Sequence, residues 1–467
     1  MTLIKSISGI RGTIGGKSGD GLNPIDIARF ASAYGTWLKL NNKDAYNNGK
    51  KLKVVVGRDA RISGDMVKNI VVGSLQGVGI DVVNLGLATT PTTELAVIYE
   101  NADGGLILTA SHNPKQWNAL KMLNNKGEFL SAADGAEVLK IAENENFSFA
   151  EVDDLGIVTE NNDYDKKHIE NVLSLKLVDV EAIRKANFKV AIDCVNSVGG
   201  IIIPKLLKAL GVNDIIELYC EPNGLFPHNP EPLPEHLHDI SKLIQKEKAD
   251  VGFVVDPDVD RLAIINENGT MFGEEYTLVA IADYILSNVN QNGKSSTVSN
   301  LSSTRALRDV TEKYGGKYFA AAVGEVNVVE KMKAVGAIIG GEGNGGVIYP
   351  ESHYGRDALV GIALFLTLLA KKEKKCSELR KEYPSYFISK NKIELDAGID
   401  VDAVLLKIKE KYKSEKITDI DGIKIDFDDK WVHLRKSNTE PIIRIYSEAK
   451  TEQKADELAK EIILSVN

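Results

Sequence analysis

Short apolar runs alternate with segments of helical period through most of the chain. The run Lys53–Val56 leads through a Gly-Arg-Asp loop into a helical segment, residues 65–76, and then into a second apolar run. The same order recurs from Lys189 to Tyr219 and, more weakly, from Ser296 to Ala321. Strands that alternate with helices in this way indicate βαβ units and mainly parallel sheets. The pattern therefore predicts three α/β domains built on a common plan.

The part of the chain from about Tyr386 onward is different in kind, because apolar and polar residues alternate in short runs there. Three such runs occur, at residues 423–427, 431–435 and 442–446. They are typical of antiparallel strands with one buried face, and residues 452–466 have helical spacing. We therefore expect a smaller C-terminal α+β domain. The Lys- and Glu-rich segment 371–375 before it is either a hinge or a solvated helix end.

A length of 467 residues exceeds what one hydrophobic core organises, so several domains are expected. We predict three similar α/β domains with mixed, mainly parallel sheets, followed by the smaller α+β domain. The predicted domains comprise residues 1–155, 156–266, 267–375 and 376–467.

Composition narrows the class of protein. Hydrophobic residues make up 43% and charged residues 26%, which is typical of a folded globular chain. The net charge of -9 argues against a general affinity for nucleic acid. The longest apolar stretch, residues 358–370, is too short to cross a bilayer and predicts a buried helix. Without a secretory signal pattern or a cysteine framework, the chain is expected to be cytoplasmic.

Residues 109–114 read Thr-Ala-Ser-His-Asn-Pro and follow an apolar run. Because a residue before proline avoids helical angles, Asn113 should end the strand abruptly and leave Ser111 on an exposed loop at a sheet edge. A serine there can act as a nucleophile or carry a phosphate, although such a segment alone is more often a capping turn. His112 directly follows Ser111 in the sequence, but this does not make a hydrolase Ser-His pair. The residues of such a pair are brought together by the fold and not by adjacency in sequence.

Three aspartates stand at alternate positions between two apolar runs: Asp256, Asp258 and Asp260. Their carboxylates can converge on a hard cation such as Mg²⁺ or Ca²⁺. An EF-hand is excluded because Arg261 stands where that motif requires glycine and because both flanks predict strands. A polar hairpin turn is the alternative, but three carboxylates this close repel one another unless a cation compensates. We therefore expect a metal site.

Two further loops carry ligand-binding chemistry. Residues 435–444 combine two arginines with a serine and a threonine around a turn, which can clamp a phosphate dianion or form an ordinary polar hairpin. Residues 340–346 read Gly-Gly-Glu-Gly-Asn-Gly-Gly. Their glycines let the backbone approach a ligand while Glu342 and Asn344 offer hydrogen bonds, and a flexible loop is the alternative.

Together, and in this order, the four motifs resemble those of the α-D-phosphohexomutase family, whose members also open with a segment ending in Ile-Arg-Gly, here residues 10–12. The resemblance covers nearly the whole chain and implies four domains, three α/β and one smaller, around a central cleft. The compact length and the Ser-Gly-Ile-Arg-Gly opening are most similar to those of the phosphoglucosamine mutases within this family.

The resemblance also implies roles for particular residues. Ser111 would be phosphorylated and would bind one Mg²⁺ together with Asp256, Asp258 and Asp260. The candidate catalytic residues are Ser111, Arg11, Lys121 and His112. The candidate substrate-binding residues are Arg261, Gly324, Glu342, Asn344, Arg435, Ser437, Asn438, Thr439 and Arg444.

Three departures from the family pattern affect these expectations. Pro257 replaces a common glycine in the metal loop, and Asn438 replaces another in the phosphate clamp. The loop at 342–346 reads Glu-Gly-Asn-Gly-Gly where many bacterial members have Glu-x-Ser-Gly-His, so Asn344 and Gly346 replace a serine and a histidine. This last departure concerns the choice of sugar and leaves the reaction unchanged.

The resemblance implies a phosphohexomutase that interconverts hexose 6-phosphate and hexose 1-phosphate through phosphorylated Ser111, with a hexose bisphosphate as intermediate or activator. Glucosamine phosphate, on the route to UDP-N-acetylglucosamine, is the expected substrate, with phosphoglucomutase or phosphomannomutase activity as the alternative. Two functions of other classes are the alternatives, a phosphoserine hydrolase and a catalytically silent sugar-phosphate-binding protein.

The expected partner is a small sugar phosphate. Neither nucleic acid nor a membrane is expected as a partner, and the chain is expected to be a monomer or a homodimer.

Overall fold

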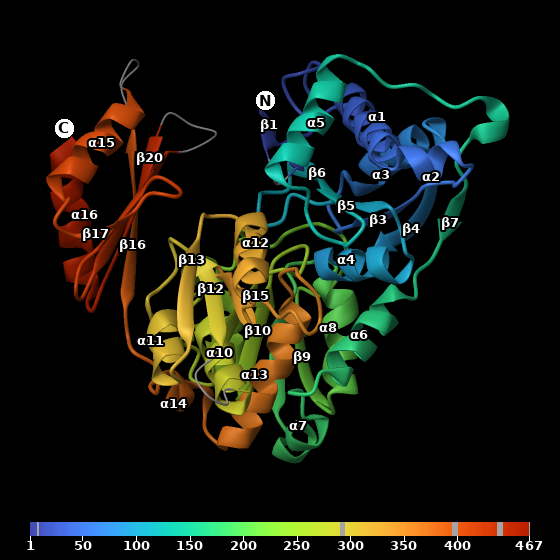
Figure 1. The fold of residues 1–467 in the computed structure, drawn as a ribbon. Helices are drawn as coiled ribbons and strands as arrows, with labels where there is room; N and C mark the ends of the chain where they lie inside the picture. Colours follow the sequence, from blue (N-terminus) through green and yellow to red (C-terminus); the bar gives the residue numbers. More distant parts are fainter. Residues whose placement is uncertain (7–8, 290–294, 395–399, 437–441, 467) are drawn as a thin grey trace. The chain divides into compact units, whose positions relative to one another are not determined.

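The computed structural model describes residues 1–6, 9–289, 295–394, 400–436 and 442–466. The chain forms two compact units, and many of their elements are labelled in Figure 1. Unit 1 comprises Met1–Thr277 and Asn344–Leu379, and unit 2 comprises Leu278–Gly343 and Arg380–Asn467. The finer division into four domains ending at residues 155, 266, 375 and 467 remains a prediction.

A mixed seven-stranded sheet organises the first part of unit 1. In spatial order its strands are β1 (Leu3–Ser6), β2 (Gly9–Thr13), β6 (Trp117–Leu123), β5 (Gly104–Leu108), β3 (Lys53–Arg58), β4 (Asp81–Leu87) and β7 (Val158–Glu160). Strands β5, β3, β4 and β7 run parallel, whereas β1, β2, β6 and β5 alternate in direction. The helices are α1 (Pro24–Asn41), α2 (Lys43–Asn47), α3 (Gly64–Gly77), α4 (Thr90–Tyr99) and α5 (Ala132–Glu143).

The apolar run of β3 supplies two cores at once. Val54 and Val56 pack in one hydrophobic core with residues of α1 and α3, whereas Val55 packs in a second core with Val97 of α4. This follows because successive strand residues point to opposite faces of a sheet. In Figure 1, α1 and α3 accordingly lie on one side of the sheet and α4 on the other. The predicted strand, helix and strand between residues 53 and 85 are confirmed as β3, α3 and β4.

The second sheet of unit 1 carries the three-aspartate loop. Its strands, in spatial order, are β11 (Leu262–Asn266), β10 (Val251–Val255), β8 (Lys189–Asp193) and β9 (Asp214–Leu218). Strands β10, β8 and β9 are parallel, and β11 is antiparallel to β10. The accompanying helices are α6 (Tyr164–Ser174), α7 (Val180–Ala186), α8 (Gly199–Ala209) and α9 (His238–Glu247). Residues 256–261 therefore form the loop of a β-hairpin.

The apolar stretch 358–370 is the buried helix α13 (Ala358–Lys372), as predicted. Asp357 caps its first turn, because Oδ1 accepts hydrogen bonds from the backbone N–H groups of Leu359 and Val360 at 2.8 and 3.3 Å. Lys371 and Lys372 form its last turn, so the charged segment begins as a helix end. The short strand β15 (Gly346–Ile348) precedes α13, and α14 (Cys376–Arg380) follows it. No helix among the described residues has the length and apolarity that a membrane span requires.

Four buried ionisable side chains meet at the N-terminus of α13. Asp357 Oδ2 lies 2.8 Å from His168 Nε2 and 3.2 Å from His353 Nε2, and His353 Nδ1 lies 3.3 Å from Glu94. Burial alone would lower the pKa of His353, but its hydrogen bonds to Asp357 and Glu94 raise the pKa to about 10. Burial would raise the pKa of Asp357, but the two histidines hold it well below its ordinary value. Within this network His353 is a cation at neutral pH.

We expect the network to make stability depend on pH at the alkaline end. The pKa of His353 is about 10 in the folded protein and 6.5 ordinarily, so its contribution is complete below 6.5 and is lost as pH rises through 10. His353→Gln should lower the melting temperature at pH 6.5 and flatten its decline up to pH 10. The effect is a few kcal/mol, at about 1.4 kcal/mol per unit of pKa.

The matched control for this experiment is His238→Gln, because His238 is an exposed histidine of the same unit. It should leave both the melting temperature and its pH profile unchanged. A steep alkaline decline that persists in His353→Gln would contradict the assignment of this pH dependence to His353.

Unit 2 contains a parallel set of strands and an antiparallel sheet. The parallel set is β13 (Lys317–Ala321), β12 (Ser296–Asn300) and β14 (Ile339–Glu342), with helices α10 (Tyr276–Val289), α11 (Ala306–Lys313) and α12 (Glu325–Val335). The antiparallel sheet has the order β16 (Phe387–Glu394), β20 (Ile442–Ala449), β19 (Trp431–Lys436), β18 (Ile423–Asp426) and β17 (Lys416–Thr418). Residues of α15 (Val401–Lys411) and α16 (Glu452–Val466) share one core with this sheet. The predicted C-terminal sheet and helix are confirmed.

Candidate active site

The loop after β5 holds Ser111 in a left-handed backbone conformation, with φ of 48°. Arg61, which is paired with Asp59, fixes this loop by donating hydrogen bonds to several of its carbonyl groups. The accepting carbonyls belong to Ser111, Asn113, Pro114 and Trp117. Ser111 is only 3% exposed, so the expectation of an exposed serine was wrong. Asp256, from the loop of another sheet, contacts its hydroxyl.

Ser111 contacts that loop directly. Its hydroxyl donates a hydrogen bond to Asp256 Oδ2 at 2.7 Å, and it lies 3.4 Å from Nδ1 of His112. A nucleophilic hydroxyl beside a carboxylate and a candidate cation site is suited to accept and donate a phosphoryl group. The structure thus brings together two motifs that are separated by 145 positions in the chain.

The three aspartates converge as the sequence predicts. One carboxylate oxygen from each of Asp256, Asp258 and Asp260 lies within 4.8 Å of the others, and all three residues are buried. Oδ1 of Asp256 accepts hydrogen bonds from the N–H groups of Asp260 and Arg261, which shapes the turn. Val259 at its centre has φ of 63°, a left-handed conformation that β-branched residues rarely adopt.

The charges of this cluster fit a bound cation. Among the described residues, Oδ1 of Asp258 and Oδ1 of Asp260 are buried without a hydrogen-bond partner. Burial raises the pKa of Asp256 well above its ordinary value, and the other two carboxylates raise it further. A divalent ion with oxygen preference, such as Mg²⁺, would satisfy both orphaned oxygens and offset this repulsion. The donor set therefore fits the predicted metal.

Lys121 and Arg11 approach the cluster from neighbouring strands. Lys121 on β6 lies 2.8 Å from Asp258 and 3.7 Å from Asp260. Burial would lower the pKa of Lys121, but these carboxylates raise it above its ordinary value, so the side chain stays charged. Arg11 on β2 donates a hydrogen bond to Asn113 in the serine loop at 2.9 Å. Because β2, β6 and β5 are adjacent, the sheet brings Arg11 to the serine loop and Lys121 to the aspartates that contact it.

His112 and Arg261 form the next layer of the same site. Burial and the nearby charges of Arg261 and Arg11 lower the pKa of His112 well below its ordinary value, so its ring is neutral at pH 7. Arg261 Nη1 lies 3.3 Å from Glu231, whereas its buried Nε has no hydrogen-bond partner among the described residues. A neutral imidazole beside a serine can accept a proton, and Arg261 retains a donor for a ligand.

Unit 2 holds Glu342 and Gly324 together. Glu342, at the end of β14, is 6% exposed, and its Oε1 accepts hydrogen bonds from Asn300 at 2.9 Å and from the N–H of Gly324 at 3.2 Å. Gly324 has φ of 115°, which few other residues adopt. Asn344 lies beyond the end of unit 2 and accepts a hydrogen bond from the N–H of Gly346 at 3.2 Å. The carboxylate of Glu342 is thus fixed in one orientation.

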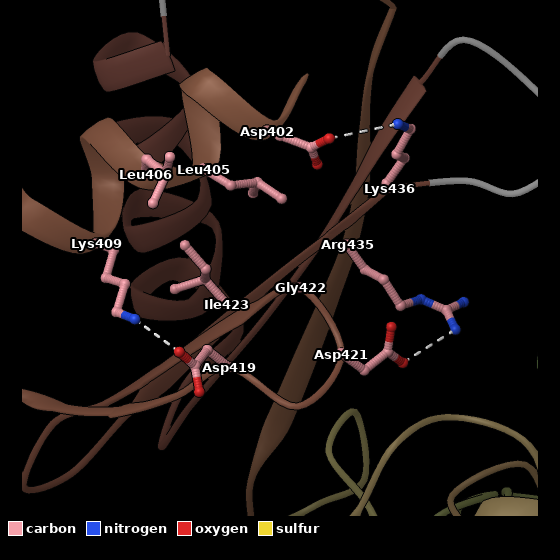
Figure 2. Close-up of a pocket in the computed structure, with 10 residues that line it drawn as sticks. All are labelled: Asp402, Leu405, Leu406, Lys409, Asp419, Asp421, Gly422, Ile423, Arg435 and Lys436. Carbon is pink, nitrogen blue, oxygen red and sulfur yellow. Dashed lines mark hydrogen bonds and ion pairs between the residues drawn. The ribbon is translucent and has the colours of Figure 1, made fainter. Parts of the chain in front are cut away.

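The predicted phosphate clamp is described only at its two ends. Arg435 on β19 and Arg444 on β20 stand directly opposite each other in the antiparallel register. Like charges at such positions are destabilising unless an anion lies near them. Arg435 pairs with Asp421 at 3.5 Å, as Figure 2 shows, beside a cavity of about 420 Å³ in unit 2. Ser437, Asn438 and Thr439 lie outside the described residues.

Sequence reasoning missed several residues that organise these sites. Arg61 fixes the serine loop, Thr90 donates a hydrogen bond to Asp258 at 2.7 Å, and Arg356 donates one to Asp260 at 2.6 Å. In unit 2, Asn300 orients Glu342, and Asp421 accepts hydrogen bonds from both Val323 and Arg435. The one sequence signal that could have indicated two of them is their position, because Thr90 begins helix α4 and Asn300 ends strand β12.

Four family models match consecutive parts of the chain. They are phosphoglucomutase/phosphomannomutase alpha/beta/alpha domain I over residues 3–149, domain II over residues 166–269, domain III over residues 273–386, and the C-terminal domain over residues 392–465. This succession, with the mixed sheets described above, confirms the predicted fold class of three α/β domains and a smaller C-terminal domain.

Complete chains are similar as well. This chain is 37% identical to a phosphoglucomutase/phosphomannomutase of Thermococcus kodakarensis over 451 residues, which cover 96% of each chain. It is 34% identical to a phosphoglucosamine/phosphogalactosamine mutase of Sulfurisphaera tokodaii, with 97% of each chain covered. A family protein from Burkholderia thailandensis has the same fold, with a TM-score of 0.83, 24% identity, and coverage of 99% of this chain and 96% of that chain.

Proposed function

Because the chain belongs to the phosphoglucomutase/phosphomannomutase family and is therefore a phosphohexomutase, we propose that it interconverts glucosamine 6-phosphate and glucosamine 1-phosphate through phosphorylated Ser111. Such an enzyme is an isomerase that moves a phosphoryl group between two oxygens of one sugar. A sugar bisphosphate is the intermediate, since the serine gives one phosphoryl group and later receives the other.

The observation that carries this proposal is the hydrogen bond of 2.7 Å from the Ser111 hydroxyl to Asp256 within the buried aspartate cluster. The φ of 48° at Ser111 points to the same conclusion, because strained backbone persists where function requires a fixed geometry.

Each residue of the cluster has a definite task in the proposed reaction. Asp256, Asp258 and Asp260 would hold Mg²⁺, which when bound supplies positive charge for the oxygens of the transferring phosphoryl group. Lys121 at the aspartates and Arg11 at the serine loop add cationic donors to the site, and such preorganised charge is the main source of catalysis in phosphoryl transfer. Neutral His112 is within reach of a proton on the Ser111 oxygen, at 3.4 Å.

In unit 2 the proposed tasks are recognition of the sugar and of its second phosphate. Glu342 is oriented by Asn300 and Gly324, and its carboxylate would accept hydrogen bonds from two neighbouring hydroxyls of the sugar. Arg435 and Arg444 would bind the phosphate that is not reacting, and an anion there would relieve the repulsion between them. Asn344, Arg261, Ser437, Asn438 and Thr439 complete the proposed set of substrate contacts.

Glucosamine phosphate is the proposed substrate because of the compact chain, its opening segment and its similarity to the Sulfurisphaera tokodaii enzyme. The similarity to the Thermococcus kodakarensis enzyme favours glucose and mannose phosphates as the second candidate. Glucose and glucosamine differ only at the 2-position, so a site that tolerates the amine without a dedicated acceptor would discriminate only modestly.

An assay of kcat/KM across a panel of sugar 1-phosphates tests the substrate. We expect the highest value for glucosamine 1-phosphate and a value within about a hundredfold for glucose 1-phosphate, as a tolerated 2-amine implies. Galactosamine 1-phosphate and mannose 1-phosphate complete the panel. A higher kcat/KM for mannose or glucose 1-phosphate would reject the glucosamine assignment and leave the phosphohexomutase standing.

The same samples separate the proposal from readings of other classes. A phosphohexomutase converts the sugar phosphate without net release of inorganic phosphate, whereas a phosphoserine hydrolase releases it in step with turnover. A silent sugar-phosphate-binding protein would bind the ligand without converting it. Phosphate release and product formation measured together therefore distinguish the three.

A further inference from the structure

The loop that begins with Glu342 ends in a glycine for a steric reason. A Cβ atom at Gly346 would lie 2.3 Å from Cδ and 3.1 Å from Cγ of Arg356. Packed interiors do not admit such approaches, so a side chain cannot occupy position 346 while Arg356 keeps its place. Position 346 is also where this chain departs from the family pattern, because many bacterial members have a histidine there. The Arg356 side chain fills the space that the missing side chain would take.

The guanidinium group of Arg356 reaches the candidate metal site. Its Nη2 donates a hydrogen bond to Asp260 Oδ2 at 2.6 Å, and the residue is 7% exposed. The charge of Arg356 also contributes to lowering the pKa of His112. Asp260 still has Oδ1 without a hydrogen-bond partner among the described residues. Arg356 therefore holds one oxygen of Asp260 and leaves the other for a cation.

The backbone of Arg356 is fixed on both sides. It forms an antiparallel bridge with Ile348, which is why its long side chain can cross diagonally to position 346. The next residue, Asp357, caps α13 and is held by His168 and His353. A side chain on so fixed a backbone starts from a defined position. The planar guanidinium group of arginine is preorganised, so it loses little further freedom when it binds a carboxylate.

We propose that Arg356 is a positioning residue for phosphoryl transfer, which orients Asp260 for metal binding and whose side chain takes the space beside Gly346. The inference rests on the proposed function and deepens it by adding a residue that acts through Asp260. Outer partners of metal ligands typically change metal affinity or activity by about 10- to 100-fold when they are removed.

The first test compares Arg356→Ala and Arg356→Lys with the wild-type protein. We expect Mg²⁺ alone, titrated by calorimetry, to bind Arg356→Ala about 10- to 100-fold more weakly, with a similar loss in kcat/KM that excess Mg²⁺ partly reverses. Arg356→Lys should recover part of the loss, and guanidinium chloride at non-denaturing concentration should partly rescue Arg356→Ala. Arg29→Ala is the matched control, since Arg29 pairs with Asp26 and Glu145 in the same unit.

The second test exchanges the two positions. Gly346→His alone should lose activity because its Cβ would collide with Arg356. In the double variant with Arg356→Ala the collision is gone, so Gly346→His should lower kcat/KM less in that background than in the wild-type protein. Such coupling is expected of two side chains that compete for one space.

Two outcomes would overturn the proposal. One is wild-type Mg²⁺ affinity and kcat/KM in Arg356→Ala. The other is a loss that follows a lowered melting temperature, without rescue by guanidinium and without coupling to position 346. Because Mg²⁺ affinity is measured without any sugar, these outcomes remain distinct from a failure of the proposed mutase reaction, which would show as absent turnover in the wild-type protein.

Discussion

Ser111→Ala is expected to abolish mutase turnover, with a loss on the order of 10⁴-fold or more in kcat, as for other enzymes that lose their nucleophile. The fold should survive, because the substitution removes one hydroxyl and its hydrogen bond to Asp256. Such a bond contributes about 1 kcal/mol, so the melting temperature should change little. A coupled assay measures the activity, and intact mass after incubation with a sugar bisphosphate measures the phosphoryl group on the protein.

The matched control is Ser32→Ala, since Ser32 is another buried serine of unit 1 and lies in α1. It should retain both turnover and the phosphoryl group. Wild-type turnover in Ser111→Ala, or a phosphoryl group that persists on that variant, would remove Ser111 from the mechanism. The family assignment would stand in either case because it does not depend on this residue's chemistry.

Asp258→Asn should have the second largest effect, a fall in kcat/KM on the order of a hundredfold at limiting Mg²⁺. Asp258 is fully buried, carries an orphaned Oδ1 and pairs with Lys121 at 2.8 Å. The substitution weakens the attraction for a cation and, in the described part of the chain, leaves Lys121 with Asp260 at 3.7 Å as its carboxylate partner. Titration of activity with Mg²⁺ should show a raised requirement that excess metal partly overcomes.

Asp65→Asn serves as the control, because Asp65 is exposed and pairs with Arg58 at the surface. It should leave the Mg²⁺ requirement unchanged. Full activity of the wild-type enzyme in the presence of a strong chelator would show that the three aspartates do not act through a metal.

The fold was largely predictable because its signals are local. An apolar run such as that of β3 with a following amphipathic helix is visible in a short window of sequence. The alternation of apolar residues in β18, β19 and β20 likewise indicated the antiparallel sheet. The sequence left open whether the segment 371–375 is a hinge or a helix end. Lys371 and Lys372 continue a helix whose end is not marked by glycine or proline, so no local signal separated the two.

The site was predictable only in part, because burial and positioning arise from distant segments. Ser111 looked exposed when its own loop was considered, and its actual burial depends on Asp256 from another sheet. Arg61 and Arg356 belong to none of the recognised motifs. Each contacts a loop that lies 50 or more positions away in the chain, Arg61 the serine loop and Arg356 the three-aspartate loop. Asp421 was missed for the same reason, since its partners Val323 and Arg435 are separated in the chain.

The left-handed backbone of Ser111 has a consequence for directed evolution. Such a conformation costs about 1–2 kcal/mol in a residue that carries a Cβ atom, so glycine at position 111 would relax the loop and offset the loss of the hydrogen bond to Asp256. A library screened only for heat resistance would therefore tolerate glycine at this position, although activity depends on the hydroxyl group. Variants of this enzyme for use at high temperature have to be sorted by turnover as well as by survival, with this codon kept constant.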